Sequence, residues 1–120
     1  MKTLLSVLLT VLLTASAAVA QQAPAKGAKS TQQLQVKTSA VCDMCKARLE
    51  KSLAYEKAVQ GVVLDVPSQM LTVTFRPDKT TPEALRTAVQ RTGYDADAQP
   101  ADTRAYDRLP DCCKKTNAVH

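Results

Sequence analysis

The stretch QLQVKTSAVCDMCKARLEKSL, residues 33–53, changes its hydrophobic period halfway along. Its first part alternates apolar or small residues with polar ones, the pattern of a half-buried strand. From Asp43 to about Ala58 the apolar residues recur at helical spacing instead. The strand-like positions are Leu34, Val36, Thr38 and Ala40, and the helical face is formed by Cys45, Leu49 and Leu53. The stretch therefore predicts a strand that runs into a helix, with two cysteines at the junction.

The residues that follow predict two more strands and a second helix. In VQGVVLDVPSQMLTVTFRPD, residues 59–78, two alternating runs flank a turn that begins at Pro67. Thr80 and Glu83 have the spacing of a capping box, and Gly93 is a candidate left-handed C-cap. YDADAQ, residues 94–99, is a weaker final strand. The order β-α-β-β-α-β predicts a ferredoxin-like α+β fold, with a four-stranded antiparallel sheet and two helices on one face.

The chain divides into four parts by composition. Residues 1–20 have the charged start, the short apolar run and the Ala-Val-Ala end of a secretory signal peptide. An uncleaved membrane anchor is disfavoured, because the apolar run is shorter than the ~20 residues of a membrane span. A flexible leader is expected at 21–32, the folded domain at 33–99 and a cysteine-containing polar tail at 100–120. We therefore expect a periplasmic or secreted protein that does not span a membrane after cleavage.

The composition argues against nucleic-acid binding and against hydrolytic catalysis. Cleavage removes Lys2 and lowers the formal charge from +5 to +4, and the remaining charges alternate in sign. One Phe and three dispersed Tyr provide no stacking platform for bases. The single histidine, His120, ends the sequence, so no Ser-His-Asp arrangement is visible. A mature chain of about 100 residues suits one small domain. We also expect a monomer, and a binding protein and not an enzyme.

Cys42 and Cys45 form a C-x-x-C pair at the predicted start of a helix. A helix N-terminus favours thiolate, and thiolates select soft cations. Two sulfurs suit Cu(I) and Hg(II), whereas Zn(II) and Cd(II) are less suited because Zn(II) normally takes four ligands. Met44, between the cysteines, is a candidate weak donor, against the ordinary alternative of an exposed or packed side chain. Two other interpretations stay open: a thiol-redox couple and a structural disulfide.

VCDMC after the first strand, VQGV before the second and TGY after the second helix resemble the heavy-metal-associated domain family. This family includes periplasmic mercuric-ion-binding proteins and bacterial copper chaperones. The resemblance implies that Cys42 and Cys45 are metal ligands, that Tyr94 lies in a neighbouring loop over the site, and that a partner domain receives the metal. The Gly and Met that usually precede the cysteines are Ser39 and Ala40 here.

Cys112 and Cys113 have no counterpart in that family pattern. The dozen residues between Pro100 and Asp111 span up to ~40 Å if extended, which is enough for a return of ~20 Å from the far end of the sheet to the first pair. The alternatives are a four-thiolate metal centre, disulfides between tail and loop, a separate second soft-metal site, and a tail disulfide or intermolecular pairing with no metal role. Sequence alone does not choose among them.

The function that these features predict is capture of Hg(II) or Cu(I) and its delivery, by thiolate exchange, to a metal-transporting membrane protein or efflux system. The alternative is a periplasmic thiol-redox or disulfide-stapled module without metal traffic.

Overall fold

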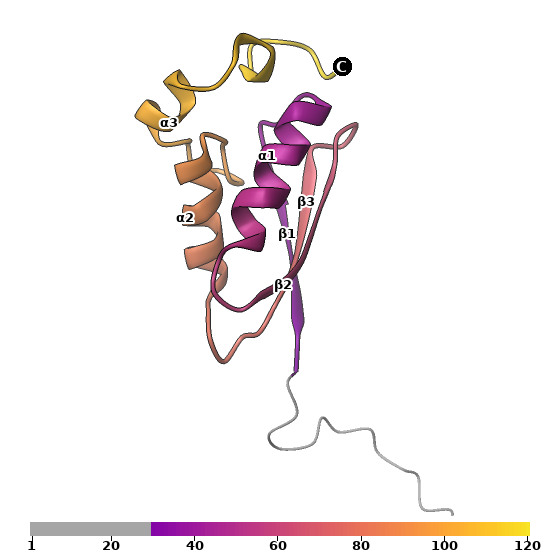
Figure 1. The fold of residues 1–120 in the computed structure, drawn as a ribbon, viewed down its shortest axis with the longest axis vertical. Helices are drawn as coiled ribbons and strands as arrows, with labels where there is room; N and C mark the ends of the chain where they lie inside the picture. The colour runs from indigo at the N-terminus through magenta and orange to yellow at the C-terminus, as the bar shows by residue number, and fades with distance from the viewer. Residues whose placement is uncertain (1–29) are drawn as a thin grey trace, which may run out of the picture.

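The structure, a computed structural model, describes residues 30–120 (Figure 1). The predicted signal peptide and residues 21–29 of the predicted leader lie outside the described residues. The elements are β1 (Gln32–Lys37), α1 (Asp43–Ala54), β2 (Val59–Asp65), β3 (Met70–Phe75), α2 (Pro82–Thr92), α3 (Thr103–Asp107) and the 3-10 turn η2 (Asp111–Cys113).

The three strands form one antiparallel sheet in the order β1-β3-β2. Leu34 lies opposite Val73, and Val73 in turn lies opposite Val62, so the alternating apolar positions of the three strands share one face. Helices α1 and α2 lie on the same side of this sheet and pack against each other (Figure 1). The α+β class, the antiparallel pairing and the two helices on one face were predicted from the sequence and are confirmed.

The predicted fourth strand is wrong as a regular strand. Residues 94–99 make only isolated bridges, from Ala96 to Thr38 and to Gln99. Asp97 adopts a left-handed φ of 52°, which turns the chain back on itself. Its side-chain Oδ1 accepts the Lys37 backbone N–H at 2.9 Å, while its own N–H donates to the Lys37 carbonyl at 2.8 Å. A carboxylate thus replaces a backbone acceptor at the sheet edge, and the described sheet has three strands.

Helix α2 begins one residue later than the predicted capping box. Thr81, not Thr80, is the N-cap, and its hydroxyl accepts the Ala84 N–H at 3.1 Å. Pro82 occupies the first helical turn, where a missing N–H costs nothing. Gly93 ends the helix with φ 111°, as its C-cap prediction required. The helix thereby delivers Tyr94 into the core at the end of the molecule where β1 also ends.

Buried side chains from both helices and all three strands form one core, and it extends into the tail. The members with no exposed surface are Val36, Ala40, Cys45, Leu49, Leu53, Leu71, Val73, Val89, Tyr94, Ala96 and Cys113. Three of the four cysteines therefore lie in the apolar interior. Cys42 is the third of them, with 6% of its surface exposed.

The predicted polar tail folds back over the cysteine end of the domain (Figure 1). Asp102 caps α3 by accepting the Ala105 N–H at 3.0 Å. Three residues of the tail are buried: Ala105, Leu109 and Cys113. Because Asp97 turns the chain back, the tail needs no long return along the sheet. Within residues 30–120, no helix is long and apolar enough to cross a membrane.

Candidate metal centre

The C-x-x-C pair lies where β1 gives way to α1. Cys42 is the N-cap residue of α1, and its carbonyl accepts the first helical hydrogen bond, from Lys46 N–H, at 3.0 Å. Cys45 lies in the first turn and faces the core. The two sulfurs are 3.3 Å apart, and all four cysteines of the chain are free thiols. The helix start thus holds both sulfurs together at a terminus whose dipole favours negative charge.

The tail brings the second cysteine pair to the same place. The Cys113 sulfur is 3.9 Å from the Cys42 sulfur, and its side chain is fully buried. Cys112 is exposed, yet the sulfurs of Cys42, Cys112 and Cys113 all lie within 4.8 Å of one another. Met44 is 48% exposed, and its sulfur contacts Cys112 at 3.8 Å. Five sulfur atoms, those of the four cysteines and of Met44, therefore gather at one end of the molecule.

Tyr94 lies beneath the sulfurs, in the loop that follows α2. Its side chain is fully buried, and its hydroxyl has no hydrogen-bond partner within residues 30–120. Burial, together with the neighbouring Cys45 and Cys113 sulfurs, raises the pKa of this hydroxyl, so it stays a proton donor. A buried and unpaired hydroxyl has a free-energy cost, and a thiolate beside it would remove that cost.

The three buried cysteine thiols differ in how readily they ionise. Burial raises the pKa of Cys42, and burial followed by the nearby Cys45 sulfur raises the pKa of Cys113. Burial also opposes ionisation of Cys45, but the polar groups around its sulfur, first the Val41 backbone and then the nearby Tyr94 hydroxyl and Cys42 thiol, outweigh burial and lower its pKa. One thiolate surrounded by donors is the arrangement expected around Cys45. Soft cations bind that form of sulfur.

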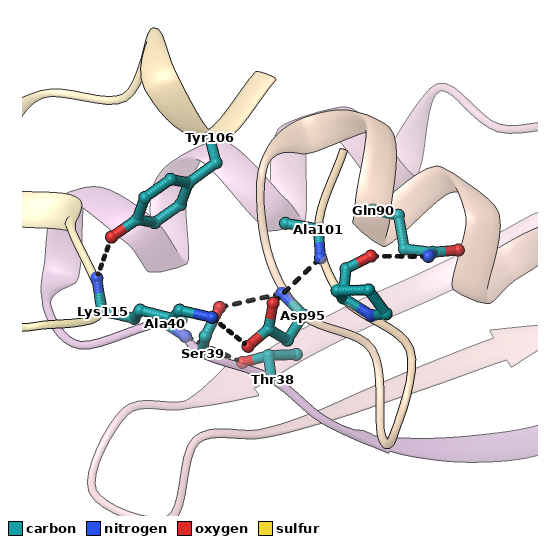
Figure 2. Close-up of polar contacts among 9 residues, drawn as sticks. Thr38, Ser39, Ala40, Gln90, Asp95, Ala101, Tyr106 and Lys115 are labelled. Atoms are coloured by element: carbon teal, nitrogen blue, oxygen red, sulfur yellow. Dashed lines mark hydrogen bonds and ion pairs between the residues drawn. The ribbon is translucent and has the colours of Figure 1, made fainter. Parts of the chain in front are cut away.

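Asp95, next to Tyr94 in the sequence, joins three segments of the chain (Figure 2). Its backbone N–H donates to the Ser39 hydroxyl at 2.8 Å, just before the cysteine loop. Its carboxylate accepts the Ala101 N–H at 2.9 Å and pairs with the Lys115 ammonium at 3.1 Å. Lys115 in turn donates its backbone N–H to the Tyr106 hydroxyl at 3.2 Å. This carboxylate ties the tail to the domain immediately beside the cysteine loop.

Sequence reasoning singled out Cys42, Cys45 and Tyr94, which the structure brings together at one end of the fold, but it missed the Asp95 junction. It also missed the last residue, whose backbone N–H donates to the Val41 carbonyl at 2.8 Å. Of these two contacts, only the Asp95 junction had a signal in the sequence. Ser39 stands where the family pattern has Gly, and the Ser39 hydroxyl is the group that accepts the Asp95 N–H.

An antiparallel α+β domain that gathers cysteine sulfurs at a strand-to-helix junction defines a class of thiolate metal-binding domains. The chain belongs to the heavy-metal-associated domain family, because the sequence pattern of that family matches residues 31–95.

Relatives of known sequence and structure agree with this assignment. Residues of this chain are 32% identical to the copper-exporting P-type ATPase of Staphylococcus aureus over 59 positions, which are 49% of this chain and 7% of the ATPase. The CopZ metallochaperone has a TM-score of 0.53 at 20% identity, covering 54% of this chain and 98% of that one. Oxidized MerP from Ralstonia metallidurans has a TM-score of 0.54 at 23% identity, covering 57% and 96%. These structures support the fold.

Proposed function

We propose that this protein is an exported carrier of a soft metal ion, Cu(I) or Hg(II), held by Cys42 and Cys45. The observation that carries the proposal is the 3.3 Å separation of the two sulfurs at the N-terminus of α1. Thiolates at a helix start select soft ions over the harder cations that prefer oxygen ligands. Family membership and the likeness of the fold to CopZ and MerP support metal binding as the role of this pair.

Delivery would proceed by exchange of ligands, not by catalysis. An incoming thiolate forms one bond to the ion as the bond to Cys42 or Cys45 breaks, and no electron is transferred. A metal-transporting membrane protein is the proposed recipient, because a copper-exporting ATPase contains a segment similar to this chain. The signal-peptide pattern of residues 1–20 supports action outside the cytoplasm, in the periplasm or medium.

Metal titration of the reduced protein tests the proposal. Native mass spectrometry is expected to detect one tightly bound Cu(I) or Hg(II) per chain, and no tightly bound ion in the Cys42→Ser/Cys45→Ser variant. Ser39→Ala is the matched control, since it alters the same loop without removing a sulfur. Tight binding by the double variant would place the site elsewhere and reject the proposal.

The same measurement separates the carrier from a thiol-redox module. A redox module would exchange disulfides with a small thiol pair and bind no ion tightly when reduced. The protein mass after purification in air reports whether two or four hydrogens have been lost to disulfides.

A further inference from the structure

Cys113 is the one member of the η2 turn whose side chain is wholly buried, and its sulfur lies 3.9 Å from the Cys42 sulfur. We propose that Cys113 is a third thiolate ligand, so that the soft ion binds among Cys42, Cys45 and Cys113 and not between the two loop cysteines alone. The inference rests on the proposed function, because it completes the same site. If Cys113 binds the ion, the C-terminal tail of the protein covers the metal site.

The sulfur spacing suits three ligands better than two. With metal–sulfur bonds of ~2.3 Å, two opposed sulfurs lie ~4.6 Å apart, whereas three sulfurs in a plane lie ~4.0 Å apart. Cys113 is already 3.9 Å from Cys42. Cys42 and Cys45, at 3.3 Å, would need to separate by about 0.7 Å for trigonal binding and by about 1.3 Å for linear binding. On these two sides of the triangle, the smaller adjustment favours the three-sulfur site.

The tail holds Cys113 in place before any ion arrives. Its backbone N–H donates to the Pro110 carbonyl at 2.8 Å, which closes the η2 turn. On either side of this turn, Leu109 packs into the core and the Lys114 ammonium donates to the Tyr106 carbonyl at 2.7 Å. The last residue, His120, bonds to the Val41 carbonyl next to Cys42. A ligand fixed at both ends loses little conformational freedom when it binds.

The unpaired Tyr94 hydroxyl is an independent indication of a ligand at this place. It is fully buried beside Cys45 and Cys113 and has no partner within residues 30–120. An ion bound by three cysteines displaces their thiol protons and leaves sulfurs that accept hydrogen bonds. The hydroxyl then gains an acceptor, which would offset the cost of its burial.

Cys112 provides a matched control, because it has the same chemistry one residue away with the opposite burial. Its sulfur lies within 4.8 Å of the Cys42 and Cys113 sulfurs, but it is exposed to solvent and contacts Met44 at 3.8 Å. Because an exposed side chain is not held in place as Cys113 is, we assign Cys112 no place among the three ligands.

X-ray absorption of the Cu(I)-loaded full chain tests the proposal. The reductant is removed and loading is done without oxygen or added thiol, so that no small molecule supplies a third sulfur. Three sulfurs per copper are expected in the wild type and in Cys112→Ser, and two in Cys113→Ala. The variant is also expected to lose Cu(I) to a competing chelator at a concentration at least tenfold lower.

Two further results would overturn the proposal and leave the carrier function intact: two sulfurs per copper in the wild type, or three in Cys113→Ala. Loss of one sulfur in Cys112→Ser would also reject it, since Cys112 would then be the ligand. A wild type that binds no copper rejects both proposals. Cys113→Ala keeps an apolar side chain in the core, and Cys113→Ser is the second variant; the circular dichroism of each apo form verifies that it is folded.

Discussion

At the scale of single residues, the approach of the tail to the domain depends on the absence of one side chain. Gly93 has φ 111°, a region that residues with a Cβ rarely adopt. A Cβ at this position would also lie 3.0 Å from the Ala105 carbonyl oxygen and 3.1 Å from the Leu109 side chain. The glycine therefore does two things: it ends α2, and it lets α3 dock against that helix end.

Gly93→Ala is expected to lower the free energy of unfolding by at least about 1–2 kcal/mol, from backbone strain alone. The close contacts with Ala105 and Leu109 add to this cost. Urea denaturation monitored by circular dichroism measures it. Gly61→Ala is the control, because a Cβ there meets only Thr74 atoms at ordinary contact distances of 3.7 and 3.8 Å. Equal midpoints for the two variants would contradict the prediction.

Glu50 predicts a pH dependence of stability away from the cysteines. Its carboxylate accepts the Leu64 backbone N–H at 2.9 Å and the Lys46 ammonium. Burial opposes its ionisation, but these two hydrogen bonds outweigh burial and lower its pKa below the ordinary 4.5. The folded state therefore binds the proton less well than the unfolded state. The stabilisation is complete above pH 4.5 and is lost as the pH falls through the lowered pKa.

We expect Glu50→Gln to be less stable than the wild type by about 1 kcal/mol at pH 7, and the difference to shrink by pH 3. Urea unfolding at the two pH values measures the difference. Glu56→Gln is the control, because Glu56 is exposed and has no side-chain hydrogen bond or ion pair within residues 30–120. A difference for Glu50→Gln that stays constant with pH would reject the assignment.

At the scale of elements, the sequence predicted the helices, strands and caps that are determined by interactions between residues close in sequence. The periodicity of β1, α1, β2 and β3 reflects burial on one face, and the Gly93 cap reflects backbone sterics, so both were visible in the sequence. The fourth strand was not predictable in this way, because its outcome depends on the Asp97 carboxylate reaching Lys37 across 60 positions and pairing with Arg86. A polar composition also hid the docked tail, whose buried residues are few and separated by charged ones.

Leu109→Ala is expected to release the tail and leave the domain folded. Leu109 is 4% exposed, and large-to-small changes at such sites cost about 2–5 kcal/mol. The destabilisation caused by Leu109→Ala cannot exceed the free energy with which the tail docks on the domain, because beyond that point the tail detaches and the domain stays folded. Trypsin is expected to cleave after Lys114 and Lys115 at least tenfold faster than in the wild type. Val119→Ala, at a 42% exposed position of the same tail, is the control and should not change the rate.

At the scale of the whole molecule, the sequence predicted a metal loop and left the number of sulfurs open. The loop could be recognised because its residues are adjacent in sequence and match a family pattern. The number of sulfurs could not, because it depends on contacts between segments 71 positions apart, Cys42 and Cys113. Those contacts exist because Asp95, Leu109 and the chain end hold the tail against the cysteine end of the domain. Metal binding and tail docking are therefore expected to stabilise each other.

This coupling predicts that bound metal protects the tail. Opening the tail must break the bond between the ion and Cys113, so the open state binds metal less tightly than the closed state. Because Cys42 and Cys45 still bind the ion in the open state, saturating Cu(I) stabilises the closed form by the ratio of the two affinities, which is expected to be at least tenfold, or about 1.4 kcal/mol. Trypsin cleavage after Lys115 in the wild type should slow by about this factor when opening is fast compared with cleavage. Cys113→Ala should be cleaved at the same rate with and without Cu(I), although Cys42 and Cys45 still bind the ion. Protection of that variant equal to protection of the wild type would mean that the ion stabilises the loop alone, and that the tail covers the site without taking part in it.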